Sequence, residues 1–124
     1  MINLISDTVT KPCKNMLAAM MSAEVGDDVF KEDPTVMQLE EKMAKMFGHE
    51  TALFCPSGTM TNQIAIKVHT KPLDEVICEK HSHIFLYEVG GYAFHSGVAI
   101  QPVESRDGKL NSELIIENIK GKFD

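Results

Sequence analysis

The stretch Pro56-Ser57-Gly58-Thr59-Met60-Thr61-Asn62 separates two segments of different periodicity. Before it, residues 51–55 (Thr-Ala-Leu-Phe-Cys) form a short apolar run that predicts a buried strand. After it, Met60, Ile64 and Val68 recur at helical spacing. The sequence therefore predicts a strand, a tight turn of small residues and a helix, in that order.

A turn of this kind leaves the first N–H groups of the helix without partners, at the positive end of the helix dipole. Ser57, Thr59 and Thr61 add hydroxyl donors, and Gly58 lets the backbone approach an anion closely. These features favour a site for one small phosphate. A simpler alternative is that Ser57 only caps the helix. Neither a Walker lysine nor a Gly-x-Gly-x-x-Gly pattern is present, so a di- or triphosphate fits less well.

The rest of the chain alternates between helix and strand signals. In the first half, the patterns predict an extended arm at 1–11, a helix from Pro12 with a methionine-rich stripe at 16–21, a polar loop at 24–34, and a helix capped by Asp33 and ended by Gly48. In the second half, they predict a helix at 59–69 and strands at 75–78 and 98–103, with an irregular or helical connection at 83–92. The last predicted element is a helix capped by Asn111 and ended by Gly121. The alternation predicts an α/β fold with a mostly parallel sheet. The stripe is expected to face a core or a subunit interface, since Met packs adaptably.

Three strands and four helices leave the edges of such a sheet open. We therefore expect residues 1–124 to be the opening section of a larger α/β domain, truncated here and incomplete without further chain.

Composition excludes several classes of protein. Apolar residues make up 44% and charged residues 24% of the 124 residues, as in globular proteins that are soluble. The net charge of −6 argues against nucleic acid or an anionic membrane surface as a partner, and no membrane span or signal peptide is visible. Cys13, Cys55 and Cys78 fit reduced thiols in a cytoplasmic protein. His81 and His83 lack further ligands nearby, so no metal site is expected.

Four motifs together carry a family resemblance. SDTVTKP at 6–12, EVGDDVFKEDPTV at 24–36, PSGTMTNQ at 56–63 and DEVICEKHSHIFLYEVGG at 74–91 closely resemble the low-specificity L-threonine aldolase family. The resemblance implies a pyridoxal 5'-phosphate (PLP) enzyme of the aspartate-aminotransferase fold. The chain would then be the N-terminal part of the large PLP-binding domain, about the first third of the family pattern.

The resemblance also implies which residues bind the cofactor. Ser57, Gly58 and Thr59 match the loop that holds the cofactor phosphate, and His83 matches the histidine that stacks on the pyridine ring and handles substrate. An imidazole suits this role because it can both stack and form hydrogen bonds.

Further residues are implied for substrate binding and proton transfer. Ser6 matches a serine near the carboxylate of the substrate, with Asp7, Thr8 and Thr10 in the same arm close to the active site. Glu88, one helical turn beyond His83, is a weaker candidate for a catalytic group that handles protons. The implied reaction is retro-aldol cleavage of L-threonine or L-allo-threonine, a small amino-acid substrate, to glycine and acetaldehyde, in a homo-oligomer (dimer or tetramer).

Some expected residues are missing. The Schiff-base lysine and the acidic partner of the pyridine nitrogen lie in later family motifs, an Asp-Gly-Ala-Arg stretch and a Ser-Lys pair, which do not occur here. The chain also departs from the family pattern at Ile5, Phe30, Lys31 and His81. Two alternatives therefore stay open: a non-enzymatic remnant or assembly module of the same fold, and a related PLP-dependent β-eliminating lyase.

Overall fold

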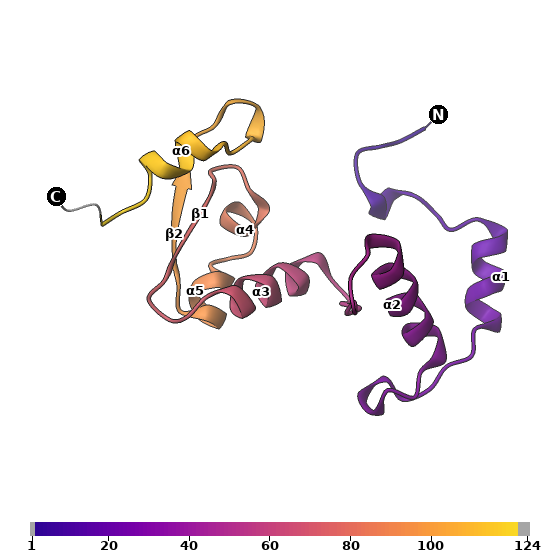
Figure 1. The fold of residues 1–124 in the computed structure, drawn as a ribbon. Coiled ribbons are helices and arrows are strands. Elements are labelled where there is room, and N and C mark those ends of the chain that lie inside the picture. The colour runs from indigo at the N-terminus through magenta and orange to yellow at the C-terminus, as the bar shows by residue number, and fades with distance from the viewer. Residues whose placement is uncertain (1, 122–124) are drawn as a thin grey trace. The chain divides into compact units, whose positions relative to one another are not determined.

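The structure is a computed structural model that describes residues 2–121 (Figure 1). The chain divides into two compact units, one up to Phe54 and one from Cys55, and each is described by itself. Among the described residues, no helix combines the length and the apolar character needed to cross a lipid bilayer.

The first unit is helical. Its elements are the 3₁₀ turn η1 (Asp7–Val9), helix α1 (Lys14–Ser22), the 3₁₀ turn η2 (Asp28–Phe30) and helix α2 (Pro34–Phe47). The extended arm predicted at 1–11 is thus wrong at its centre. There, the Ser6 hydroxyl lies 2.9 Å from the Thr8 hydroxyl and also accepts from the Thr8 N–H, which favours a tight turn over a strand.

The ends of α2 follow the predicted signals. The Asp33 carboxylate accepts the Val36 N–H at 2.8 Å, Pro34 occupies the first turn, and Gly48 ends the helix in the left-handed conformation at φ 70°. Helix α1 begins two residues later than Pro12 suggests, with Cys13 at the N-cap position.

The loop before α2 folds back onto the same carboxylate. The second oxygen of Asp33 accepts the Gly26 N–H at 3.0 Å, and the Thr35 hydroxyl donates to the Glu24 carbonyl at 2.6 Å. The N–H groups of Val36 and Gly26, which favour the ionised form, lower the pKa of Asp33 against the opposing effect of burial. A β-carbon on Gly26 would lie 2.1 Å from the Glu32 carbonyl oxygen, so only glycine fits this approach.

The second unit contains the sheet. Its elements are helix α3 (Gly58–His69), strand β1 (Glu75–Glu79), helices α4 (His83–Leu86) and α5 (Gly91–Ser96), strand β2 (Ala99–Val103), the 3₁₀ turn η3 (Arg106–Gly108) and helix α6 (Ser112–Glu117). The two strands pair in parallel, with Glu75 opposite Ala99 and Glu79 opposite Val103, and the chain crosses between them through α4 and α5 (Figure 1). This confirms the α/β class and the parallel pairing.

Helix α6 is shorter than predicted. Asn111 caps it as expected, accepting the Leu114 N–H at 2.8 Å. The helix ends at Glu117 and not at Gly121, because Asn118 closes the last turn with its N–H on the Ile115 and Ile116 carbonyls. The Lys120 ammonium forms an ion pair with Glu75 at the start of β1.

The strand predicted at 51–55 is absent from the described residues. A strand needs a neighbour for its ladder of hydrogen bonds, and β1 and β2 pair only with each other. The Phe54 N–H instead donates to the Glu40 carboxylate on α2 at 2.7 Å.

Few apolar side chains are buried in the part of the chain that the structure describes. They are Ala44 in the first unit and Ile66, Cys78, Val98 and Val103 in the second. The methionine-rich stripe of α1 is exposed, so its assignment to a core is wrong for the described chain, and its assignment to a subunit interface stays a prediction.

Candidate active site

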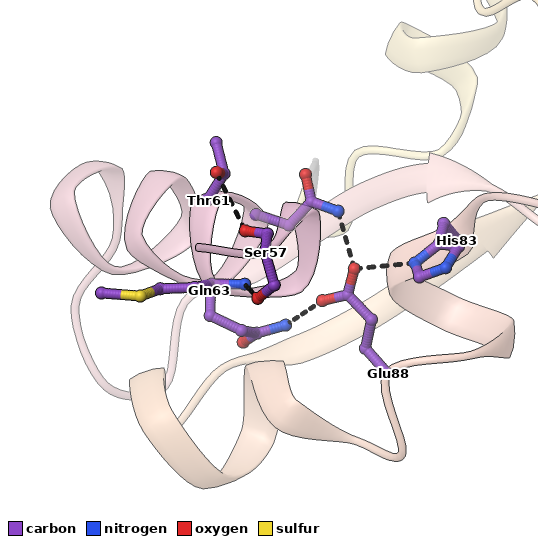
Figure 2. A network of polar contacts seen from close by, with 7 residues as sticks. Ser57, Thr61, Gln63, His83 and Glu88 are labelled. Atoms are coloured by element: carbon purple, nitrogen blue, oxygen red, sulfur yellow. Dashed lines mark hydrogen bonds and ion pairs between the residues drawn. The ribbon is translucent and has the colours of Figure 1, made fainter. Parts of the chain in front are cut away.

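The N-terminus of α3 is open. The Ser57 hydroxyl accepts the Met60 N–H at 3.1 Å, and the Thr61 hydroxyl donates to the Ser57 carbonyl at 3.2 Å (Figure 2). The N–H groups of Gly58 and Thr59 occupy the first two helical positions, which have no acceptor within the helix. A β-carbon on Gly58 would meet nothing within 4 Å. Ser57 is therefore a helix cap, as the simpler alternative states, and the turn still offers N–H donors to an anion.

A second group of polar side chains converges on Glu88. The Asn62 amide donates to Glu88 Oε1 at 2.6 Å, the Gln63 amide donates to Oε2 at 2.5 Å, and His83 Nδ1 lies 2.9 Å from Oε1 (Figure 2). Asn62 and Gln63 belong to α3 and His83 begins α4. One carboxylate thus connects the helix after the turn to the segment that carries His83.

The backbone around Glu88 holds it in this place. Helix α4 ends at Leu86, so Glu88 lies beyond the helix and not on its next turn. Val89 and Gly90 then adopt left-handed conformations, with φ of 53° and 72°. That conformation is costly for a β-branched residue, so the fold accepts local strain directly beside Glu88.

Glu88 is buried and ionised. Its side chain is 0% exposed. Burial acts to raise the pKa of this carboxyl, but the hydrogen bonds from Asn62, Gln63 and His83, with the charge of His83, together outweigh burial and lower the pKa. A group with this environment inside a cluster of polar side chains is a candidate for a functional site.

His83 is exposed on the other side of its ring. Its side chain is 60% exposed, and its ring centre lies 5.4 Å from that of Tyr87 at a tilt of 47°. The ring is held at Nδ1 and exposed elsewhere, so it could stack on a flat ligand or accept a proton from a substrate.

The structure brings together two of the predicted site residues, His83 and Glu88. Ser57, Gly58 and Thr59 lie in the same unit, at the start of the helix that supplies two ligands of Glu88. Ser6 belongs to the first unit, and its role stays a prediction.

Sequence reasoning missed Asn62 and Gln63. A usable signal was present at Gln63, which lies three residues before Ile66 on the buried face of α3. A polar side chain on a buried face needs a partner. Gly91 on α5 accommodates this side chain, because a β-carbon there would lie 2.9 Å from the Gln63 amide carbon.

Comparisons with known proteins assign the chain to a family. Residues 3–124 match the family model described as beta-eliminating lyase. The chain belongs to this family, whose enzymes are PLP-dependent in general.

Curated relatives narrow the similarity further. The chain is 42% identical over 121 residues to the low specificity L-threonine aldolase of Escherichia coli K12, covering 97% of the chain and 36% of the relative. It is 48% identical over 116 residues to low-specificity L-threonine aldolase 1 of Arabidopsis thaliana, covering 92% of the chain and 32% of the relative. It is 38% identical over 122 residues to the Saccharomyces cerevisiae enzyme of that type, covering 98% of the chain and 31% of the relative. The predicted resemblance is confirmed, and the chain spans about a third of the length of these relatives.

Proposed function

We propose that these residues are the N-terminal section of a PLP-dependent aldehyde-lyase that cleaves L-threonine and L-allo-threonine to glycine and acetaldehyde. One observation carries the proposal: an exposed imidazole, His83, is anchored by a buried carboxylate in the unit that also offers the open turn Ser57–Thr59. The proposal includes a cytoplasmic location and assembly into a homodimer or homotetramer.

The residues of the turn fit the phosphate of the cofactor. The donor set is two backbone N–H groups at a helix N-terminus and the hydroxyls of Ser57 and Thr59, and the space above Gly58 is open. The exposed ring of His83 would stack on the pyridine ring. When bound, PLP supplies the electron sink for the charge that develops at Cα.

The remaining roles concern the substrate. His83 accepts the proton of the β-hydroxyl group, which allows the Cα–Cβ bond to break and releases the aldehyde. Ser6 binds the carboxylate of the substrate. The 124 residues contain no Ser-Lys pair, so this proposal requires the Schiff-base lysine from further chain.

A segment exchange tests the function. Residues 3–124 replace the matching segment of the E. coli relative, and acetaldehyde release from L-allo-threonine is followed with alcohol dehydrogenase and NADH. We expect turnover, and His83→Asn in the exchanged segment should lower kcat by about 100-fold or more, as loss of a general base does. An exchanged enzyme with the relative's circular dichroism spectrum and oligomer size but no turnover would refute the proposal and favour a non-enzymatic module.

The family description favours one second candidate, β-elimination. An enzyme of that kind would release ammonia and a 2-oxo acid from an amino acid with a leaving group at Cβ. The same exchanged enzyme, incubated with L-serine, distinguishes the two reactions through a lactate dehydrogenase assay for pyruvate.

A further inference from the structure

The Glu88 carboxylate is too deeply placed to contact substrate. Its side chain is 0% exposed, and both of its oxygens are occupied by donors from other side chains. The role first predicted for it, a catalytic group that handles protons, requires access that this geometry does not provide. Its influence must therefore pass through His83, the partner of Glu88 whose ring is exposed.

The hydrogen bonds decide where His83 carries its proton. An ionised carboxylate only accepts hydrogen bonds. Glu88 Oε1 accepts from Asn62 Nδ2, so the contact of 2.9 Å with His83 Nδ1 requires an N–H at Nδ1. In the neutral ring, Nε2 then holds the lone pair, because only one ring nitrogen is protonated. Nε2 has no hydrogen-bond partner within residues 2–121.

The amide of Gln63 is oriented by the same carboxylate. Its nitrogen donates to Glu88 Oε2, while its oxygen is buried without a partner in the part of the chain that the structure describes. Turning the amide over would place two acceptor oxygens against each other. The protein thus leaves an acceptor unpaired, which costs stability, and keeps the donor on Glu88.

We infer that Glu88, clamped by the amides of Asn62 and Gln63, is a positioning residue that fixes His83 in the Nδ1–H tautomer and leaves Nε2 as the nitrogen that accepts the substrate proton. The role of the tautomer in turnover rests on the proposed function; the tautomer itself does not. In the transfer, the β-hydroxyl proton moves to the lone pair of Nε2, and the ring becomes a cation with an N–H at both nitrogens. The Glu88 carboxylate, 2.9 Å from Nδ1, then forms an ion pair with that cation. Carboxylates that orient a histidine in this way act through the ring and not on the substrate.

The first test reads the tautomer in the exchanged enzyme described above, in which the rest of the relative completes the fold. Histidine labelled with ¹⁵N reports whether each ring nitrogen is protonated, and the His83 signals are assigned by their loss in His83→Asn. We expect a protonated Nδ1 and an unprotonated Nε2 at neutral ring charge. Glu88→Gln should move the proton toward Nε2, since the new amide can donate to Nδ1. Glu117→Gln, the same change on the exposed face of α6, should leave the His83 signals unchanged.

The second test measures turnover in the exchanged enzyme. Glu88→Gln should lower kcat by about 10-fold or more, because the wrong tautomer leaves Nε2 without its lone pair, while KM changes less than about threefold because substrate contacts remain. Gln63→Leu, which removes one clamp, should cause a smaller loss of kcat. Gln38→Leu on an exposed position of α2 is its matched control and should have no effect.

The two tests separate this inference from the proposed function. A protonated Nε2 in the exchanged enzyme with Glu88 in place, or rapid exchange between tautomers there, overturns the inference. An active exchanged enzyme in which Glu88→Gln leaves kcat unchanged also overturns it. A third outcome is an inactive exchanged enzyme in which His83 has the expected tautomer and loses it in Glu88→Gln. That result would refute the proposed function and leave the positioning role of Glu88 intact.

Discussion

Replacing Gly26 by alanine should open the loop that precedes α2. The new β-carbon would lie 2.1 Å from the Glu32 carbonyl oxygen, 2.6 Å from the Glu32 carbonyl carbon and 3.1 Å from the Asp33 nitrogen. All of these atoms belong to the backbone, so no change of side-chain rotamer relieves the contact. The loop must move, and the hydrogen bond of 3.0 Å from the Gly26 N–H to Asp33 must lengthen.

The size of the effect follows from two opposing contributions. Overpacking costs about 1–3 kcal/mol. Because the atoms that the new β-carbon meets belong to the backbone, we expect a cost at the upper end of that range, about 3 kcal/mol. The substitution also restricts the unfolded chain, which offsets about 0.4–1 kcal/mol. We expect a net loss of about 2 kcal/mol in the local opening free energy, or roughly 30-fold in opening equilibrium, since about 1.4 kcal/mol is tenfold.

Hydrogen exchange measured by mass spectrometry can detect this change locally. Peptides from the loop and the first turn of α2, residues 24–38, should exchange roughly 30-fold faster in Gly26→Ala, while peptides from α3 serve as an internal reference. Gly58→Ala is the matched control, because its β-carbon meets nothing within 4 Å. Exchange within about twofold of the unsubstituted chain at 24–38 would show that the loop does not pass Glu32 as closely as the structure has it.

Three further predictions concern the second unit. The folded-state pKa of Glu88 lies below the ordinary value of 4.5, so its stabilising contribution is present above pH 4.5 and is lost as the pH falls through the folded-state pKa. Thermal unfolding measured from pH 7 to pH 3 should show this loss of stability, and Glu88→Gln should flatten the dependence of stability on pH. Ser57→Ala removes the cap on the Met60 N–H and should destabilise α3 by about 1 kcal/mol, visible as faster exchange in peptides of 58–63, whereas unchanged exchange would argue against the cap. Val89→Gly relieves a left-handed conformation at φ 53° and should raise the unfolding midpoint in urea; a lower midpoint would contradict the strain.

The elements predicted well are those with local signals. Asp33, Pro34 and Gly48 fix both ends of α2 through groups within a few residues of one another, and Ser57 and Asn111 cap their helices in the same way. These contacts are short in sequence, so the pattern alone contains them. The parallel pairing of β1 and β2 also follows, because a helical crossover separates the two strands.

The features predicted poorly depend on distant partners. The run 51–55 has strand composition, but a ladder needs a neighbouring strand, and Glu40 provides the acceptor for Phe54 instead. Glu88 was identified by its spacing from His83 on a helix, but α4 ends before it, and the contact arises from the turn at Val89. The amides that hold Glu88 lie 25 and 26 residues away along the chain, beyond the reach of any local pattern.

The carboxylate of Glu88 serves three donors from two helices, and this has a consequence for protein engineering. Replacing Asn62, Gln63 or His83 alone withdraws a donor from a buried charge, and replacing Glu88 by an apolar residue leaves the buried amide of Gln63 without an acceptor. Functional substitutions at these positions should therefore occur in compensating combinations. A library that saturates one position at a time would recover few active variants, and a library that varies the four positions together is the one suited to redesigning this site.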